Sequence, residues 1–234
     1  MTVDPLVLMT DVDQAMDRLV RTAETFGDAD VAAPSLLPGW SRGHVLTHVA
    51  RHADAMTNLF TWARTGVETP AYPSPAARAE GIEAGAGRPA AEQLADLRET
   101  HERMADAAAA MPAEAWAFAI PGRNQLAAVL PWGRLREIEV HHVDLAAGYA
   151  PTDWPDAFAL RLLREIVTDA GSEAPPMVLR PFGIEHPMTI GRAGDAPVIG
   201  GPTRAIAAWL AGRGDGAELT VTPDGELPQP TFWK

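Results

Sequence analysis

Apolar residues recur at three- and four-residue intervals along most of the first 150 positions, which is the period of amphipathic helices. The pattern predicts one helix over about residues 5–27 and a second from Ser41, which can cap its N-terminus, to about Arg64. A third is expected over about 90–110, where Pro112 ends it. The fourth begins at about Leu126 or Trp132 and runs to Ala147, with Gly148 as its natural terminator.

The segment between the second and third helices has a different character. Residues 66–89 are rich in Pro, Gly and Ala and poor in large apolar side chains, so no regular element is expected there. A connection of this length is either loosely ordered or a lid over a site. Four helices with one long crossover indicate an antiparallel four-helix bundle with sites built between facing helices.

After Gly148 the pattern changes to a mixture of helix and strand. Trp154-Pro155 opens a helix to about residue 170, and a second helix is expected over about 203–211. Short β-type runs occur at about 177–180, 188–191, 197–199 and 218–222. The fold class is therefore α+β, with a helical bundle over residues 1–150 and a small α/β domain over 151–234.

Composition narrows the possible functions of this 234-residue chain. Its formal net charge is -12 and it has no basic stretch with interleaved aromatics, which disfavours nucleic acid as a partner. The acidic N-terminus lacks the features of a secretory signal, and no run of about 20 apolar residues could span a membrane, so a cytoplasmic protein is expected. The acidic sequence gives no reason to require an oligomer, and a monomer or weak homodimer is expected.

The chain has no cysteine, which excludes disulfides, cysteine-based zinc sites and a protein thiol nucleophile. It also lacks a P-loop, a Gly-x-Ser-x-Gly elbow and a His-Glu-x-x-His motif. Any sulfur chemistry therefore needs a thiol supplied by a small molecule.

Two sets of polar residues could bind a metal ion. Glu137 and His141 are four residues apart, so they project from one helix face, and Asp144 follows three residues later. Ordinarily, the glutamate of such a pair is a solvent-exposed charge on the helix surface, and the histidine is half-buried. The second helix has His44, His48 and His52 in one line, which is either a polar stripe facing water or a stripe bordering the core. If the two lines converge, three N/O ligands suit zinc and leave a fourth position open. The spacing does not say which histidine points inward.

The segment Leu37-Pro-Gly-Trp-Ser-Arg-Gly-His-Val-Leu-Thr-His-Val-Ala resembles the start of the second helix in DinB-like proteins. The segment Arg136-Glu-Ile-Glu-Val-His-His-Val-Asp-Leu-Ala-Ala-Gly-Tyr resembles the matching part of the mycothiol-dependent maleylpyruvate isomerase family. The C-terminal third fits through Gly201-Pro-Thr-Arg-Ala-Ile-Ala-Ala-Trp-Leu-Ala-Gly-Arg. The resemblance implies that His48, Glu137 and His141 are zinc ligands. By position, it also implies that Arg213 is a catalytic residue that binds anionic substrate.

The resemblance implies a zinc- and mycothiol-dependent cis-trans isomerase that converts maleylpyruvate to fumarylpyruvate by reversible thiolate addition. Arg78 and Arg88 in the long connection could contribute to anion binding. Two alternatives stay open. One is a zinc-dependent S-transferase that joins mycothiol or another small thiol to an electrophile. The other is a non-catalytic binding module stabilised by metal.

Overall fold

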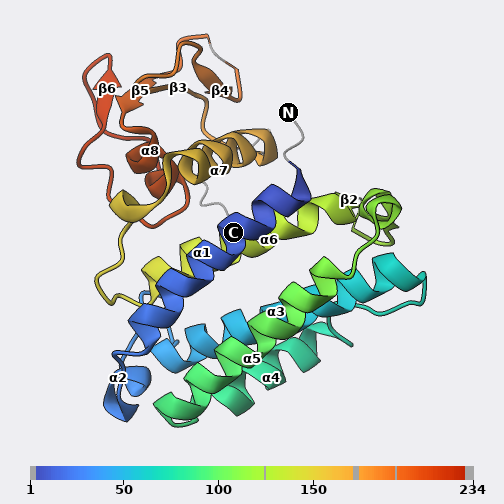
Figure 1. Ribbon diagram of the computed structural model, residues 1–234. Helices are drawn as coiled ribbons and strands as arrows, with labels where there is room; N and C mark the ends of the chain where they lie inside the picture. The colour runs from blue at the N-terminus through green and yellow to red at the C-terminus, as the bar shows by residue number, and fades with distance from the viewer. Residues whose placement is uncertain (1–3, 124, 171–173, 193, 230–234) are drawn as a thin grey trace. The chain divides into compact units, whose positions relative to one another are not determined.

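The computed structural model describes residues 4–123, 125–170, 174–192 and 194–229. The chain divides into two compact units, Met1–Ala147 and Gly148–Lys234. The first unit is almost entirely helical, and the second combines helices with a sheet (Figure 1). This architecture confirms the predicted α+β class.

Four long helices form the first unit: α1 (Pro5–Ala23), α3 (Arg42–Thr65), α5 (Ala90–Ala109) and α6 (Leu130–Asp144). Helix α3 packs against α5 and α6, and α1 packs against α5 and α6, so that the four enclose one core. The α5–α6 connection carries two short 3-10 turns (Ala113–Ala117 and Ala127–Val129) and the antiparallel pair β1 (Ala119–Ile120) and β2 (Gln125–Leu126).

Helix α1 starts where the Asp4 side chain accepts a hydrogen bond from the Leu6 amide at 2.9 Å, and Pro5 takes the first helical position. It ends at Ala23 and not near residue 27, because a separate short helix follows. That helix, α2 (Asp28–Ala32), begins after Gly27, whose amide donates to the Asp30 carboxylate at 2.8 Å.

The expectation of no regular element over 66–89 is wrong. Helix α4 spans Pro75–Ala86, and the Ser74 hydroxyl caps it by accepting from the Ala77 amide at 3.0 Å. Only Ile82, Gly85 and Ala86 of this helix are buried. The helix escaped detection because it packs through small residues and has no stripe of large apolar side chains.

The start of α3 and the end of α4 approach each other at backbone distance. A Cβ atom on Gly43 would overlap the Ala86 carbonyl oxygen and lie 2.7 Å from Nε2 of Gln93. Gln93 is 1% exposed, and its side-chain amide donates to the Ala86 and Arg88 carbonyls at 3.0 and 3.2 Å. Gly43 and the Gln93 amide together fix α4 beside α3.

The left-handed residue at the end of α6 is Ala146, at φ 51, and not the expected Gly148, which has φ 92 further along the chain. A left-handed alanine costs about 1–2 kcal/mol. Arg42 stabilises this turn by donating from Nε to the Leu145 carbonyl at 2.7 Å and from Nη2 to the Ala146 carbonyl at 2.8 Å. The turn is thereby tied to the first residue of α3.

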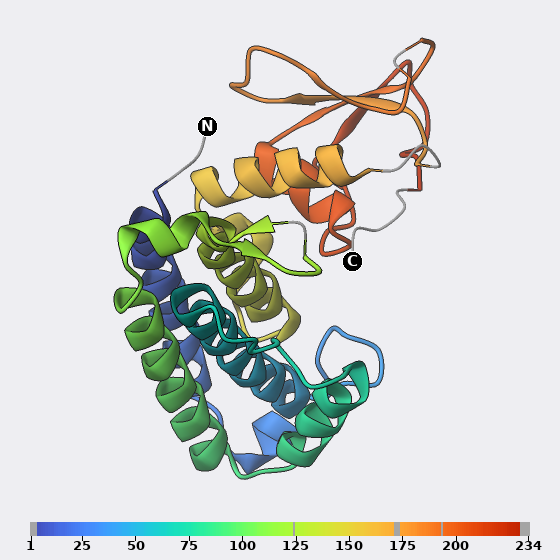
Figure 2. The ribbon, with the colours of Figure 1, turned by 90° about the vertical axis from the view of Figure 1, so that its right-hand side faces the viewer.

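The second unit contains a short 3-10 turn (Pro151–Asp153), helices α7 (Asp156–Asp169) and α8 (Thr203–Leu210), and a four-stranded sheet. Its strands are β3 (Met177–Pro181), β4 (Met188–Ile190), β5 (Val198–Gly201) and β6 (Thr220–Thr222), in the order β4-β3-β5-β6. The β3–β5 pair is parallel and the other two pairs are antiparallel. Helices α7 and α8 pack together on one side of this sheet (Figure 2).

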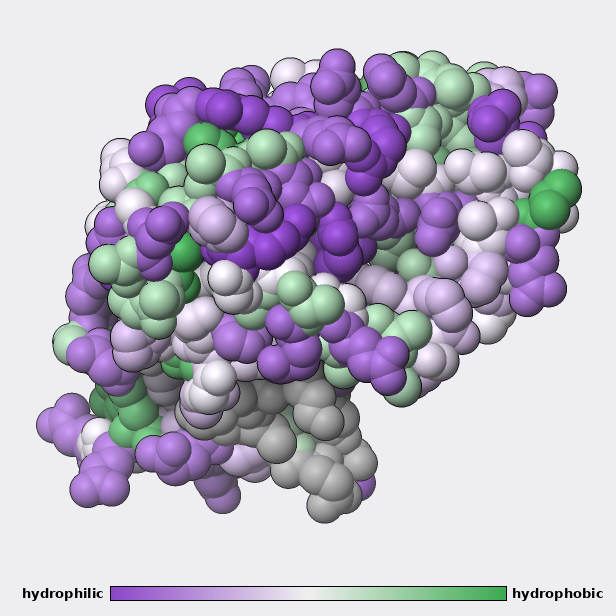
Figure 3. Space-filling model, turned by 90° about the horizontal axis from the view of Figure 1, so that it is seen from below, coloured by the Kyte–Doolittle hydropathy of each residue, from purple (hydrophilic) through white to green (hydrophobic). Residues whose placement is uncertain are grey.

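On the face of the protein seen in Figure 3, hydrophilic residues predominate and hydrophobic residues are scattered in small groups. Among the described residues, no helix combines the length and the apolar character needed to cross a membrane.

The packing of α4 on α3 gives the first prediction. Gly43→Ala should lower the free energy of unfolding by about 1–3 kcal/mol, because its methyl group has no room against the α4 backbone. Gly81→Ala is the matched control. It lies within α4, where a Cβ would meet its nearest atom, Cδ of Arg51, at 3.8 Å. The control should be neutral or stabilising by up to about 1 kcal/mol. Urea unfolding of both variants measures the difference, and equal stabilities would contradict the close packing.

Candidate metal centre

The middle of α3 faces α6, and three side chains meet between them. His48 comes from α3, whereas Glu137 and His141 lie one turn apart on α6. Nε2 of His48 is 3.0 Å from Oε2 of Glu137 and 3.0 Å from Nε2 of His141, and the latter two atoms are 3.3 Å apart. His48 is only 3% exposed, so the reading of this stripe as facing water is wrong for that residue.

The three donor atoms fit a divalent ion. Zinc bonds of about 2.0–2.2 Å place neighbouring tetrahedral ligands about 3.3–3.6 Å apart, and the separations here are at most a few tenths of an ångström shorter. Two imidazole nitrogens directed at each other and at one carboxylate oxygen cannot all be satisfied by the available protons. A cation held by all three would satisfy them at once. Among the described residues, no other group of three or more His, Asp or Glu side chains brings its ligand atoms within 4.8 Å of one another.

The surroundings of the cluster fix its charge. Burial alone would raise the pKa of Glu137, but the imidazoles of His52, His141 and His48 outweigh this effect and hold that pKa well below its usual value. Burial lowers the pKa of His48, so its imidazole is neutral at neutral pH. The cluster therefore supplies an ionised carboxylate and a neutral imidazole, and a metal ion held here would displace any proton on the ring nitrogens that face it.

The other ring nitrogen of His141 has its own partner. Nδ1 of His141 lies 2.9 Å from Oδ2 of Asp144, which is 1% exposed. Burial would lower the pKa of His141, but hydrogen bonds to the Asp144 and Glu137 carboxylates reverse this effect and raise it to about 9. With Asp144 accepting the Nδ1 proton, Nε2 is oriented toward the centre of the cluster, which is how a buried carboxylate usually supports a metal-binding histidine.

His44 and His52, the other members of the histidine line, lie apart from the cluster. Nδ1 of His44 is 2.7 Å from the Ser41 hydroxyl at the start of α3. His52 accepts a hydrogen bond from Arg134 at 3.3 Å. Among the three histidines, only His48 points at Glu137 and His141.

An open pocket of about 600 Å³ adjoins the cluster and lies within the helical unit. Its walls come from α3, the segment before α4, α4 itself, Arg123 and α6: His48, His52, Ala71, Tyr72, Pro73, Ser74, Pro75, Arg78, Arg123, Arg136 and Glu137. Three arginines therefore surround a cavity bordered by two of the three donor residues. This concentration of positive charge contrasts with the net charge of -12.

Arg78 and Arg88, both in the long connection, have different surroundings. Arg78 lies over the Tyr72 ring at 6.0 Å, and its Nη2 is 3.3 Å from Nδ1 of His48. Arg88 instead pairs with the Asp96 carboxylate and does not line the pocket. The composition of the connection could not show that only Arg78 lines the pocket, because the positions of both arginines depend on helix α4. Tyr72 and Arg123 escaped the sequence analysis altogether, since neither belongs to a recognisable motif.

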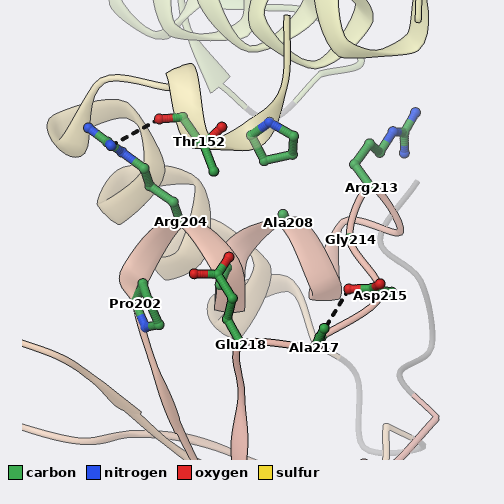
Figure 4. A pocket seen from close by; sticks show the side chains of 12 residues that line it. Thr152, Pro202, Arg204, Ala208, Arg213, Gly214, Asp215, Ala217 and Glu218 are labelled. Atoms are coloured by element: carbon green, nitrogen blue, oxygen red, sulfur yellow. Dashed lines mark hydrogen bonds between the residues drawn. The ribbon is translucent and has the colours of Figure 1, made fainter. Parts of the chain in front are cut away.

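Arg213 lies in the second unit, after α8. It donates from Nη1 to the Ala211 carbonyl at 2.8 Å and lines a pocket of about 290 Å³. Figure 4 shows Arg213 and Arg204 on opposite sides of this pocket, with Arg204 donating to the Thr152 carbonyl at 3.0 Å. The catalytic role of Arg213 stays a prediction.

A family model described as the mycothiol maleylpyruvate isomerase N-terminal domain matches residues 12–146. A crystal structure of a mycothiol-dependent maleylpyruvate isomerase matches with a TM-score of 0.90 and 29% identity, covering 99% of this chain and 98% of that one. A crystal structure of a mutant enzyme of the same name matches with a TM-score of 0.89 and 28% identity, and covers the same shares. No curated protein matches the chain. Because the family model spans more than half of its length, the chain belongs to the mycothiol maleylpyruvate isomerase family.

Proposed function

We propose that this protein is a zinc- and mycothiol-dependent isomerase that converts maleylpyruvate to fumarylpyruvate. The observation that carries the proposal is the cluster of His48, Glu137 and His141, a three-donor set at the wall of a pocket rich in arginine. Structural zinc sites usually have four protein ligands, whereas a three-ligand set leaves a position for a reactant. The two matching crystal structures are of mycothiol-dependent maleylpyruvate isomerases, whose activity agrees with this chemistry.

Each part of the proposed centre has a role. A divalent ion at this site would lower the pKa of a thiol that takes its open position, which makes the thiolate available at neutral pH. His48 and His141 would bind the ion through Nε2, and the ion would displace the Nε2 proton that the raised pKa of His141 keeps on that ring. Glu137 supplies one negative charge, while Asp144 holds the His141 ring. The thiol comes from a small molecule because the chain has no cysteine.

In the proposed reaction the thiol sulfur adds to the cis double bond of the substrate, which becomes a single bond and rotates. Elimination of the thiol then gives the trans isomer. Addition followed by elimination divides one difficult rotation into easier steps. The substrate keeps its carboxylates throughout, so the chain must hold an anion while its central bond turns.

Arg78, Arg123 and Arg136 are the residues we propose for that task, because they line the same pocket as His48 and Glu137. Guanidinium groups bind carboxylates through paired hydrogen bonds and keep their charge at any physiological pH. We propose Arg213 as a further anion-binding residue of the reaction, on the ground of the family resemblance.

Metal analysis tests the ligand assignment. The purified protein should contain about one zinc ion per chain, and His48→Ala and His141→Ala should each lose it. Asp144→Asn should keep the ligands but bind zinc about 10–100-fold more weakly. His44→Ala is the control on the same helix, one turn before His48, and should retain the metal. Full zinc content in both ligand variants would show that the assignment is wrong.

The reaction itself is tested by product analysis. With zinc, mycothiol and maleylpyruvate, the protein should form fumarylpyruvate, and a chelator should abolish the activity until zinc is restored. Omission of the thiol should have the same effect. Stable thiol adducts without fumarylpyruvate would identify an S-transferase instead and overturn the isomerase proposal.

Substitution of a pocket arginine tests the proposed anion site. Arg78→Met should lower kcat/KM about 10–100-fold, because a hydrogen bond to a charged group is worth about 1.5–3 kcal/mol. Arg88→Met is the matched control, two residues after the end of α4. It breaks the pair with Asp96 and should leave kcat/KM within a factor of about two. Equal effects of the two substitutions would remove Arg78 from the substrate site.

A further inference from the structure

Arg134 of α6 is a fully buried cation, three residues before the proposed metal ligand Glu137. It is 0% exposed, and burial lowers its pKa only to about 10, so it is charged at neutral pH. Its Nη1 donates to the Val49 carbonyl at 2.7 Å and to Nδ1 of His52 at 3.3 Å. Among the described residues, no carboxylate lies within ion-pair distance of it. A buried charge with so few partners has a large influence on each group that it does contact.

The contact with Arg134 determines which nitrogen of His52 carries the proton. A guanidinium group has donors only, so Nδ1 of His52 must be the acceptor. With Nδ1 accepting, the ring cannot carry a proton on both nitrogens, so it is neutral. A neutral imidazole whose Nδ1 accepts has its proton on Nε2.

The protonated nitrogen of His52 faces the pocket. His52 is half-buried and lines the same cavity as His48 and Glu137. Within the described chain, Nε2 has no hydrogen-bond partner. It is not one of the solvent-inaccessible side-chain atoms without a partner, so it retains some exposure to solvent. Since Nδ1 is turned toward Arg134, Nε2 is the polar edge that His52 presents to the cavity. Its ring centre is 6.3 Å from that of His48, one helical turn away.

We propose that His52 is a catalytic hydrogen-bond donor, whose Nε2–H, fixed in this tautomer by Arg134, binds the carbonyl oxygen of the substrate and stabilises the enolate formed on thiol addition. This inference rests on the proposed function and gives a role to a histidine that is not a member of the metal-binding cluster.

The electron balance shows why such a donor is needed. When the thiolate sulfur bonds to one alkene carbon, the alkene electron pair forms a new double bond to the carbonyl carbon. The carbonyl electron pair then moves onto oxygen, so one negative charge passes from sulfur to oxygen. After rotation the electrons return by the same path, the carbon–sulfur bond breaks, and the thiolate leaves. No proton is transferred, and His52 keeps its Nε2 proton throughout.

A neutral donor suits this reversible step. An imidazolium could release its proton to the enolate oxygen and trap the adduct, whereas a neutral imidazole releases its Nε2 proton only with great difficulty. The donor is also in place before the reaction starts, because Arg134 and the α3 backbone hold it. Donors that are fixed in advance at the position of developing charge contribute strongly to catalysis.

Two substitutions at position 52 separate donation from packing. His52→Phe removes the donor and should lower kcat about 10²–10³-fold. His52→Gln is the matched control, because its amide oxygen can accept from Arg134 while its NH₂ group donates into the pocket. It should retain kcat to within about tenfold. Both variants should keep about one zinc ion per chain, which excludes loss of the metal as the cause.

The tautomer of His52 can be determined by NMR, without any measurement of activity. In the wild-type protein, ¹⁵N NMR of the histidine rings should show His52 neutral, with the proton on Nε2, across pH 6–8 and in both metal-free and zinc-loaded samples. This measurement does not depend on whether a variant folds. A proton on Nδ1, or a charged ring, overturns the inference.

The results distinguish this inference from the proposed function. If the wild-type protein isomerises maleylpyruvate and His52→Phe does so at the same rate, the role of His52 is wrong and the proposed function stands. A wild-type protein with bound zinc and mycothiol that forms no fumarylpyruvate overturns both. Loss of rate in His52→Phe, retention in His52→Gln and the Nε2 proton in the spectrum together support the donor.

Discussion

The structure depends on one contact, the approach of two imidazole nitrogens and a carboxylate oxygen to about 3 Å between α3 and α6. Polar atoms so close together at a largely buried site need a shared proton or cation, because two nitrogens and an oxygen with lone pairs only would repel one another. Two of them come from a single helix face, so the arrangement requires that α6 present that face to α3. The position and rotation of α6 are therefore the central constraint on the fold.

Other buried polar side chains of α6 meet this constraint. Glu139, which is 1% exposed, accepts a hydrogen bond from Arg18 of α1 at 2.5 Å. His142, also 1% exposed, lies 2.8 Å from the Thr22 hydroxyl of α1. Arg134, on the same face as Glu137 and His141, donates to the α3 backbone. Because a buried polar group left without a partner is costly, rotation of α6 would break several of these contacts at once. Glu137 and His141 are thereby kept facing His48.

The sequence was informative where elements follow a simple period. The large apolar residues of α1 and the Ser41 cap of α3 are visible along the chain, and the four strands of the second unit fall close to the expected runs. Helix α4 could not be predicted, because it packs through Gly85 and Ala86 and its partner is Gly43, which is distant in sequence. Because α4 was not predicted, the sequence also could not show that Arg78 lines the pocket and Arg88 does not.

The candidate site, too, could be predicted only in part from the sequence. Spacing alone placed Glu137 and His141 on one face but left three histidines of the second helix equivalent. The choice of His48 came from the family resemblance, and the structure brings that residue to the other two. That these side chains bind zinc stays a prediction, as does the role of Arg213. Spacing could not reveal the contact of His52 with Arg134, because it joins two helices and depends on how each is rotated.

The arginines of this site have a common physical property that lysine would not provide. Lys234 is the only lysine in the chain, so all cations near the pocket are guanidinium groups that remain charged even when buried. Burial lowers the pKa of Arg134 to about 10, which still leaves it a donor at neutral pH, whereas a buried lysine can lose its proton and become an acceptor. A neutral amine beside Nδ1 of His52 would no longer dictate the tautomer of that ring. The fixed charge of Arg134 therefore makes the direction of the His52 proton a property of the fold, independent of pH over the range in which the protein is folded and Arg134 is charged.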